Sequence, residues 1–417
     1  MGDRYRHPGI PLITHNTAGF PVAETDSSSE SIYLVGEGSS PDGDRPFLDS
    51  LDLVNKRKRR IFRSKEPFFE LPVLLLDSQK DKVLIMRESP NSPPNFFRVS
   101  KEGEEEVRLT SNDNRYPEFV GVQRILLKYK RSDRLDLTAN LYLPSGYDIQ
   151  RDGPLPTLVW AYPKAYLSAE NASQIKRSPF QYIFPKWNQP LLWISKGFAV
   201  VDDPAMPILS KGRSSPNDSF VPQLVDSAKA LVDELVKQGV SEEGRIVLGG
   251  HSYGAFMTAN LLAHSDLFCA GIARSGAYNR TLTPFGFQSE ERNLWEASKT
   301  YLSMSPFLFA NGINEPLLLF HGEKDDNPAT YPIQSERLFH ALQGLGGQAR
   351  LVVFPNEGHT FRGKETILHY LWEMEQWLNL HVKQQTPLEE LPGGLNRNYA
   401  DSSIKRSTDA TSGERTD

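Results

Sequence analysis

The chain has a single cysteine, Cys269, among its 417 residues, and it has no run of about eighteen apolar residues. One cysteine excludes an internal disulfide and suits a reducing compartment. Without a long apolar run, we expect no segment that spans a membrane. Cys269 lies in an apolar stretch, where we interpret it as a small buried side chain rather than as a reactive thiol.

The chain also has no surplus of positive charge, because it contains 47 basic and 52 acidic residues and its net charge is −5. Binding to a nucleic-acid backbone is therefore not expected. The first residues lack the apolar core of a secretory signal, so we expect a protein that is not secreted. The sequence predicts no cofactor and no metal site, and it gives no indication of the oligomeric state.

Up to about residue 110, short apolar segments alternate with polar turns. The expected strands are residues 31–35, 47–54, 73–76, 83–87, 96–99 and 107–109. Strands joined in this way form a β-meander, and meanders of about four strands build the blades of a propeller. Residues 1–119 therefore predict a partial β-propeller of about two blades, in which the basic run 56–60 is the solvated tip of a hairpin.

From about residue 120, strands alternate with helical segments. The expected strands are residues 125–130, 135–143, 157–162, 198–201, 245–249, 271–274, 316–321 and 350–354, and the expected helices are residues 190–196, 221–238, 253–264, 331–345 and 364–382. This alternation predicts an α/β domain over residues 120–383, with a mostly parallel, doubly wound sheet between two layers of helices. Residues 384–417 are polar and predict a disordered tail.

A Gly-x-Ser-x-Gly motif stands between an apolar run and a helical run, with Ser252 at its centre. Where a strand turns sharply into a helix, the serine is exposed in a strained conformation and side chains at the glycine positions would clash. The helix N-terminus then faces negative charge that develops near the serine. We therefore interpret Ser252 as a nucleophile of the α/β-hydrolase type, with a purely structural turn as the alternative.

A serine hydroxyl needs a base to take its proton and an acid to hold that base in the right tautomer. In the α/β-hydrolase fold both follow later strands, in the order serine, acid, histidine. Asp325 follows the strand expected at 316–321, and His359 follows the last strand. The sequence thus predicts Asp325 as the acid and His359 as the base, and the neighbouring Asp326 and Glu323 stay open as alternatives for the acid.

The oxyanion of an acyl-transfer reaction needs two hydrogen-bond donors. One is expected to be the backbone N–H of Tyr253, the residue after the nucleophile. The other is expected from the loop after the strand at 157–162, where Pro163 has no N–H to give. The hydroxyl of Tyr162 is therefore the predicted second donor, with a tyrosine of the core as the alternative.

Two long stretches, residues 249–264 and 271–288, carry a resemblance to a known family. The first reads Gly-Gly-His-Ser-Tyr-Gly-Ala-Phe-Met-Thr-Ala-Asn-Leu-Leu-Ala-His, and the second reads Gly-Ile-Ala-Arg-Ser-Gly-Ala-Tyr-Asn-Arg-Thr-Leu-Thr-Pro-Phe-Gly-Phe-Gln. Both resemble the prolyl-oligopeptidase family of serine peptidases, and within it the glutamyl endopeptidase branch of plant chloroplasts. The resemblance covers about residues 31–383.

This resemblance implies a serine endopeptidase that acts on peptides or small proteins and cleaves them after glutamate. It implies the same roles for Ser252, Asp325, His359 and Tyr162, and a location in the plastid stroma or, failing that, in the cytoplasm. A carboxylesterase or an acylaminoacyl peptidase with the same triad is an alternative, because a triad does not define the pocket beside it. An inactive, truncated paralogue that only binds other molecules is a second alternative.

An arginine is the expected partner for an acidic substrate side chain, because its guanidinium binds a carboxylate with two parallel hydrogen bonds. In this family part of the pocket wall follows the strand after the nucleophile helix, and that segment contains Arg280. We predict that Arg280 binds the substrate carboxylate, with Arg274 as the next candidate. The alternative is that Arg280 forms a structural ion pair with Glu290 or Glu291.

Overall fold

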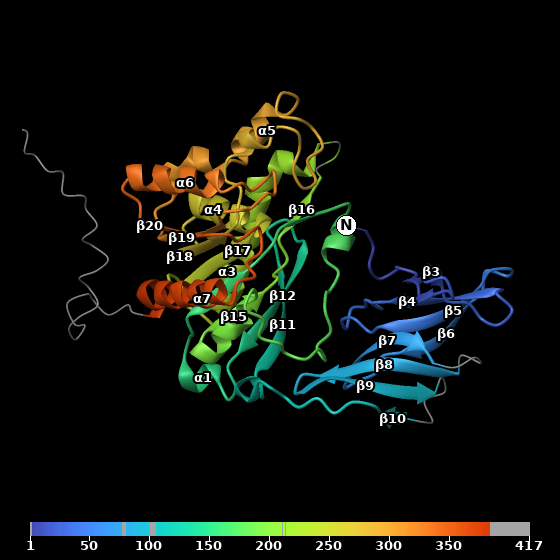
Figure 1. Ribbon diagram of the computed structural model, residues 1–417. Coiled ribbons are helices and arrows are strands. Elements are labelled where there is room, and N and C mark those ends of the chain that lie inside the picture. Colours follow the sequence, from blue (N-terminus) through green and yellow to red (C-terminus); the bar gives the residue numbers. More distant parts are fainter. Residues whose placement is uncertain (1, 77–80, 101–105, 211, 213, 384–417) are drawn as a thin grey trace, which may run out of the picture. The chain divides into compact units, whose positions relative to one another are not determined.

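The first part of the chain consists of short antiparallel strands, as Figure 1 shows for the computed structural model, which describes residues 2–76, 81–100, 106–210, 212 and 214–383. One sheet has the order β1-β4-β5-β6, with β1 (Ile10–Pro11), β4 (Ser31–Gly36), β5 (Phe47–Asp52) and β6 (Lys58–Arg63). The other has the order β10-β9-β8-β7, with β7 (Phe69–Leu75), β8 (Lys82–Ser89), β9 (Ser92–Ser100) and β10 (Glu106–Arg108). A hairpin of β2 (Ile13–His15) and β3 (Pro21–Ala23) completes this part.

These two four-stranded antiparallel sheets confirm the predicted β-meander, a partial propeller-like region. The basic run 56–60 is exposed, as expected, but only residues 56 and 57 lie in the turn between β5 and β6, because β6 begins at Lys58. Asp49 lies opposite Arg60 in the neighbouring strand and is buried. Lys58 and Arg60 both pair with this carboxylate, which explains why the basic run continues into the sheet.

The second part is built around one eight-stranded sheet with the order β11-β12-β15-β13-β17-β18-β19-β20. Its strands are β11 (Gln123–Lys130), β12 (Asp136–Leu143), β13 (Thr157–Trp160), β15 (Ala199–Asp202), β17 (Ile246–His251), β18 (Ala270–Arg274), β19 (Leu317–Gly322) and β20 (Ala349–Phe354). The first two pairings are antiparallel and the following five are parallel. A separate short pair consists of β14 (Lys164–Tyr166) and β16 (Pro207–Leu209).

Helices cover both faces of this sheet (Figure 1). One face packs against α3 (Phe220–Lys237), α4 (Tyr253–His264) and α6 (Ile333–Gly344), and the other against α7 (Lys364–Leu378) and the 3₁₀ segment η2 (Pro190–Lys196). Neighbouring residues such as Val159 and Leu158 belong to opposite faces and are fully buried, as in a parallel sheet between two helical layers. The predicted α/β-hydrolase architecture is confirmed.

The sequence predicted the long helices, whereas it did not predict several short elements. These are α1 (Ile149–Asp152), α2 (Ala169–Ala172) and α5 (Ser298–Ser303), together with the 3₁₀ segments η1 (Pro117–Phe119), η3 (Pro216–Ser219), η4 (Arg280–Leu282) and η5 (Pro306–Gly312). The helix expected at 364–382 is α7 followed by a final π-helical turn, η6 (Asn379–Lys383). The predicted helix at 190–196 is the 3₁₀ segment η2, which ends where Gly197 adopts a left-handed conformation.

The described residues up to Lys383 belong to one compact unit. The predicted division between residues 1–119 and 120–383 stays a prediction, and the predicted tail at 384–417 lies outside the described residues. Within the part of the chain that the structure describes, we find no helix with the length and apolar character needed to cross a bilayer. Burial raises the pKa of the Cys269 thiol to about 11, in agreement with an unreactive side chain.

Candidate active site

Ser252 lies at the sharp turn between β17 and α4, where the sequence predicted a nucleophile. Its backbone has φ 58° and ψ −116°, a conformation that residues with a side chain rarely adopt. The backbone N–H of Ser252 donates to the carbonyl oxygen of Arg274 on the neighbouring strand at 2.8 Å. The serine is half-buried, so the turn is fixed by the sheet while the side chain stays accessible.

Two glycines make this turn possible. A Cβ at Gly250 would lie 2.4 Å from the backbone carbonyl carbon of Gly254, and a Cβ at Gly254 would lie 2.4 Å from the carbonyl oxygen of Ala161. Both distances are well inside van der Waals contact, so a side chain at either position would displace backbone. The close approach at Gly254 also brings the loop after β13, which carries Tyr162, next to the nucleophile turn.

The Asp325 carboxylate, which follows β19, is only 3% exposed and has several hydrogen-bond donors around it. Its Oδ2 accepts from Nδ1 of His359 at 2.8 Å and from the Thr330 hydroxyl at 3.1 Å, and its Oδ1 accepts from the backbone N–H of Asn327 at 3.1 Å. Burial alone would raise the pKa of this carboxyl, but hydrogen bonds from His321 and His359 outweigh burial and lower the pKa of Asp325 well below its ordinary range. Asp325 is therefore charged at neutral pH.

The two alternative acids do not reach the histidine. Asp326 is exposed, and Glu323 is also exposed and accepts the backbone N–H of Asn356 at 3.2 Å. Neither forms a hydrogen bond with His359 among the described residues. The structure therefore brings Asp325, and not its neighbours, to the predicted base.

His359 lies between β20 and α7, and 25% of its side chain is exposed. Because Nδ1 is bound to Asp325, its Nε2 is left for a second partner, as a general base requires. The ring of His251, the residue before Ser252, lies 4.7 Å from the ring of His359 between centroids. No described hydrogen bond joins the Ser252 hydroxyl to His359, and such bonds often form only in the substrate complex. The triad roles stay predictions that this geometry supports.

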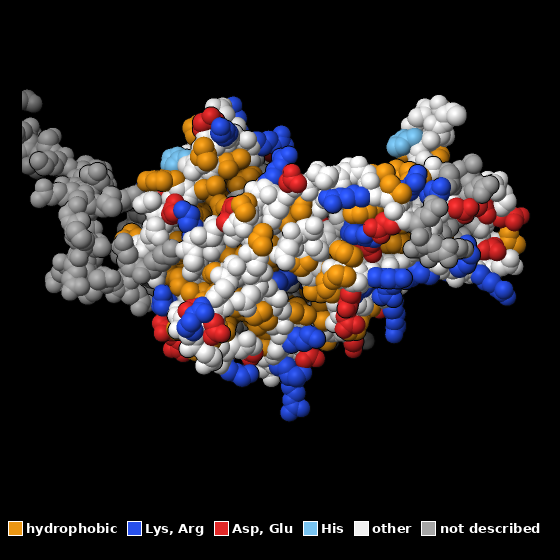
Figure 2. Space-filling model, turned by 90° about the horizontal axis from the view of Figure 1, so that it is seen from below, with side chains coloured by type: hydrophobic (Ala, Val, Ile, Leu, Met, Phe, Trp, Pro, Cys, Tyr) orange, Lys and Arg blue, Asp and Glu red, His pale blue; other side chains and the backbone are white. Residues whose placement is uncertain are grey.

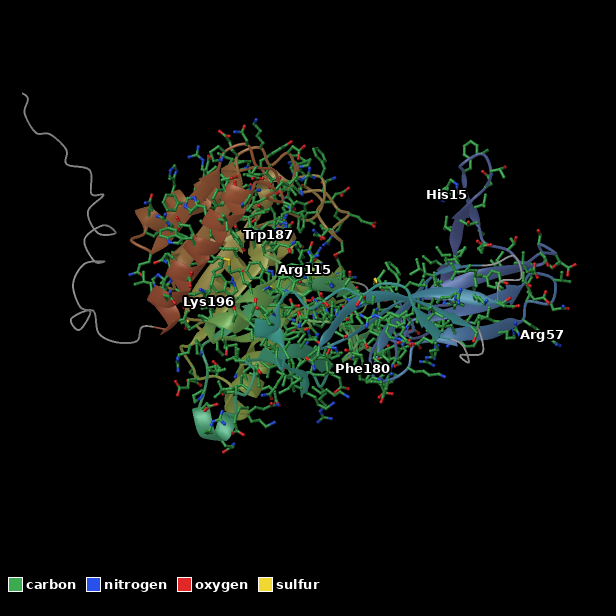
Figure 3. All side chains as sticks on the ribbon, turned by 60° about the horizontal axis from the view of Figure 1, so that its bottom comes forward. His15, Arg57, Arg115, Phe180, Trp187 and Lys196 are labelled. Atoms are coloured by element: carbon green, nitrogen blue, oxygen red, sulfur yellow. The ribbon has the colours of Figure 1, made fainter. Side chains whose placement is uncertain are left out.

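Arg274 supports the site from the face of the sheet that α7 covers. Its Nε donates to Nδ1 of His251 at 3.1 Å, and its guanidinium lies 5.2 Å from the ring of Trp187, a residue that Figure 3 labels, and 5.3 Å from the ring of Tyr370. Burial, together with the charges of Arg274 and His359, lowers the pKa of His251 to about 3. His251 is therefore neutral, and Arg274 lies among aromatic rings.

The two residues predicted to supply the oxyanion donors have neighbouring rings. Tyr253 is the first residue of α4, so its backbone N–H has no acceptor within the helix. The ring of Tyr162 lies 5.8 Å from the ring of Tyr253. The Tyr162 oxygen accepts a hydrogen bond from Nε2 of Gln288 at 3.1 Å, which leaves the phenolic proton for another acceptor. Their role in binding an oxyanion stays a prediction.

Arg280 is only 2% exposed, and among the described residues it has no acidic partner. Its guanidinium carbon lies 4.1 Å from the ring of Phe256, 4.3 Å from the ring of Phe287 and 5.4 Å from the ring of Tyr253. Its Nε finds no hydrogen-bond partner among the described residues. Burial lowers the pKa of Arg280 to about 10, so the side chain is still charged at neutral pH.

The alternative of a structural ion pair for Arg280 is wrong, since no ion pair of Arg280 is found in the part of the chain that the structure describes. Glu290 instead pairs with Arg292, at 2.8 Å, and accepts from the side chain of Asn217 at 3.2 Å. The turn that carries Arg280 is held by α6, because Gln334 accepts the backbone N–H groups of residues 278 and 279. A buried cation beside the nucleophile helix thus has rings around it but no counter-charge.

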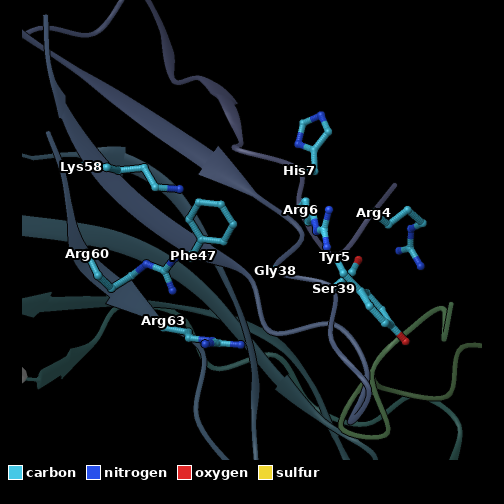
Figure 4. Close-up of a pocket in the computed structure, with 10 residues that line it drawn as sticks. All are labelled: Arg4, Tyr5, Arg6, His7, Gly38, Ser39, Phe47, Lys58, Arg60 and Arg63. Carbon is cyan, nitrogen blue, oxygen red and sulfur yellow. The ribbon is translucent and has the colours of Figure 1, made fainter. Parts of the chain in front are cut away.

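A basic pocket lies away from this site, in the N-terminal sheets. Figure 4 shows its lining, which includes Arg60 and Arg63, and its volume is about 280 Å³. None of the described lining residues is acidic, but Arg60 and Lys58 already pair with Asp49, and Arg4 pairs with Asp44. On the face that Figure 2 shows, basic and acidic side chains are intermixed. This pocket therefore offers little free positive charge.

Three residues around the site were not predicted from the sequence. His321 and Thr330 both contact Asp325, and Gln288 contacts Tyr162. Each contact depends on how a loop turns back onto a strand end. Only the position of His321 near the end of a strand beside the predicted acid gave a signal, and that signal was too weak to assign a role.

The fold and the site define an α/β-hydrolase with a serine at its nucleophile elbow and a histidine–aspartate pair close to it. Residues 223–385 match the prolyl oligopeptidase family, so the chain carries a domain of that family. This match confirms, over these residues, the resemblance to the prolyl-oligopeptidase family that was read from the sequence.

Two curated plant relatives cover most of the chain. Each is named "Probable glutamyl endopeptidase, chloroplastic": the protein from Oryza sativa subsp. japonica is 44% identical over 90% of this chain, and the protein from Arabidopsis thaliana is 42% identical over 97% of it. The chain spans only 42% and 44% of their lengths.

Solved structures show the same fold at low identity. Dipeptidyl peptidase 4 of Porphyromonas gingivalis superposes with a TM-score of 0.64 at 18% identity, over 86% of this chain and 49% of that one. The acylaminoacyl peptidase of Pyrococcus horikoshii superposes with a TM-score of 0.61 at 19% identity, over 88% of this chain and 56% of that one.

Proposed function

We propose that this chain contains the catalytic part of a serine endopeptidase that hydrolyses peptide bonds after glutamate. The observation that carries the proposal is Arg280, a buried cation next to Tyr253, the residue after Ser252. In the part of the chain that the structure describes, Arg280 has no acidic partner. A buried charge without a counter-charge is costly, and a substrate carboxylate would supply the missing charge. The names of the two plant relatives support the same specificity.

In this proposal the Ser252 hydroxyl attacks the carbonyl carbon of the scissile bond while Nε2 of His359 takes the hydroxyl proton. Asp325 accepts the Nδ1–H of His359, which keeps Nε2 unprotonated at the start and stabilises the imidazolium that forms. The backbone N–H of Tyr253 and the hydroxyl of Tyr162 donate to the oxyanion. His359 then gives its proton to the leaving amine, and water hydrolyses the acyl-enzyme by the same steps.

Two measurements test the proposal. A fluorophosphonate probe should label Ser252, and no labelling would reject a serine hydrolase. A peptide panel that differs only in the residue before the cut should be cleaved after glutamate in preference to glutamine and leucine. Equal cleavage of all three peptides would reject the specificity, and turnover of simple esters or acylated amino acids alone would favour the carboxylesterase or the acylaminoacyl peptidase.

We also propose a plastid location, because both plant relatives are named chloroplastic. Fluorescence microscopy of the native precursor fused to a fluorescent protein tests this location. Signal confined to the cytoplasm would contradict it.

A further inference from the structure

A second histidine, His321, binds the same carboxylate oxygen as His359. It is the fifth residue of β19 and is completely buried. Its Nε2 lies 3.1 Å from Oδ2 of Asp325 and 2.6 Å from the backbone carbonyl oxygen of Thr330. Its Nδ1 lies 2.7 Å from the Ser335 hydroxyl on α6. Every nitrogen of this ring therefore has a partner.

The partners determine where the proton of His321 lies. A carboxylate and a backbone carbonyl only accept hydrogen bonds, so Nε2 must carry a proton and donate to both. Ser335 can donate its hydroxyl proton to Nδ1, which lets the ring stay neutral while all its groups are satisfied. His321 is thus a donor toward Asp325 and has no free nitrogen with which to accept a proton from it.

The hydrogen bonds of His321 also connect the two ends of the loop from Asp325 to Thr330. Nε2 holds the carboxylate of Asp325 at the start of the loop and the carbonyl of Thr330 at its end. The hydroxyl of Thr330 lies 3.1 Å from Oδ2 of Asp325 and 3.1 Å from Nδ1 of His359. His321 therefore fixes at once the acid and the hydroxyl that contact the base.

We propose that His321 is a positioning residue for the triad, which holds Asp325 ionised and oriented so that Oδ2 faces Nδ1 of His359. The inference rests on the proposed function, in which Asp325 and His359 act together. His321 does not touch the substrate, and it acts only through the carboxylate. Loss of its N–H should therefore lower kcat and leave KM for the same peptide nearly unchanged.

A pair of substitutions separates this role from simple packing. His321→Met fills the cavity but has no donor, whereas His321→Gln can place an amide N–H near the former position of Nε2. We expect His321→Met to lower kcat by about ten- to a hundredfold, the effect of losing one hydrogen bond to a charged group, and His321→Gln to recover most of the loss. The proton on Nδ1 of His359, observed by NMR as a downfield resonance, should shift in the first variant and return in the second.

If His321→Met does not fold, His321→Asn replaces it, because its amide reaches Ser335 but is too short for Asp325. Wild-type kcat in the variant without the donor would overturn the inference, and so would equal losses in the Gln and Met or Asn variants. Ser252→Ala, measured beside them, tests the proposed function separately. Peptide turnover that survives in Ser252→Ala would refute the proposed function itself. If Ser252→Ala loses peptide turnover but His321→Gln and His321→Met have equal kcat, only the role of His321 is refuted.

Discussion

Replacement of Arg280 by glutamine is the most direct test of how the substrate is recognised. Glutamine keeps polarity and much of the length but removes the charge. The carboxylate of a glutamyl substrate would then lie beside Phe256 and Phe287, the rings that contact Arg280, without a counter-charge. A glutaminyl substrate carries no charge and should be affected little.

The size of the effect follows from the burial of Arg280. Leaving one partner of a buried charge pair unpaired costs about 2 to 5 kcal/mol. At about 1.4 kcal/mol for each tenfold, this range corresponds to a loss of about thirtyfold to several thousandfold in kcat/KM. We expect about a hundredfold, near the lower end, because Arg280 is already buried in the free protein and its desolvation is not part of the binding cost.

The assay compares kcat/KM for a glutamyl and a glutaminyl peptide in the wild type and in Arg280→Gln. The melting temperature gives a second readout: removing an unpaired buried charge should leave the stability unchanged or raise it. Arg274→Gln is the matched control, since that arginine is equally buried but binds His251, and it should affect both peptides alike. Equal losses for both peptides in Arg280→Gln, together with a lower melting temperature, would refute substrate recognition by Arg280.

Three further predictions concern the triad and the N-terminal sheets. Ser252→Ala should abolish covalent labelling by a fluorophosphonate and lower turnover by several orders of magnitude, and retained labelling would contradict its role as nucleophile. Asp325→Asn should lower kcat by about three to four orders of magnitude, whereas Asp326→Asn, at an exposed position, should change kcat little. The reverse result would assign the role of the acid to Asp326. Burial raises the pKa of Glu88 to about 7 in the folded protein, so this carboxyl loses its proton at lower pH in the unfolded chain, and the folded protein should lose stability as the pH rises from about 4.5 to 7. In Glu88→Gln this part of the pH dependence of the melting temperature should disappear. An unchanged profile would contradict the prediction.

The fold could be predicted from the sequence because its signals are local. The apolar run at residues 317–320, which begins β19, predicts a buried strand whatever lies beside it. The glycines around Ser252 are required by close backbone contacts at the turn. The order of serine, acid and base along the chain then led to the prediction of Asp325 as the acid and His359 as the base. Each of these inferences uses residues close together in the sequence or an order that the fold imposes.

The supporting residues could not be predicted because their contacts join distant segments. Gln288 meets Tyr162 across 126 positions of the chain, and nothing near either residue indicates the other. Arg274 and Arg280 are six positions apart, yet one lies among the rings on the α7 side and the other beside α4. Which of them faces the substrate depends on the path of the backbone between them, and the apolar pattern does not define that path.

A comparison with other arginines of the chain supports the proposal that Arg280 binds the carboxylate of the substrate. Arg131 is buried but pairs with Asp133 at 2.8 Å, and the partly exposed Arg177 pairs with Asp202 at 2.6 Å, so each has a charge partner within the chain. Arg274 is as buried as Arg280 and also lies among aromatic rings, but its Nε donates to His251. Arg280 has aromatic rings instead, which stabilise a cation by only about 1 to 2 kcal/mol and supply no acceptor for its N–H groups. A residue selected for stability at this position would be neutral. In the proposed reaction, the carboxylate of the substrate would supply the charge partner that Arg280 lacks among the described residues.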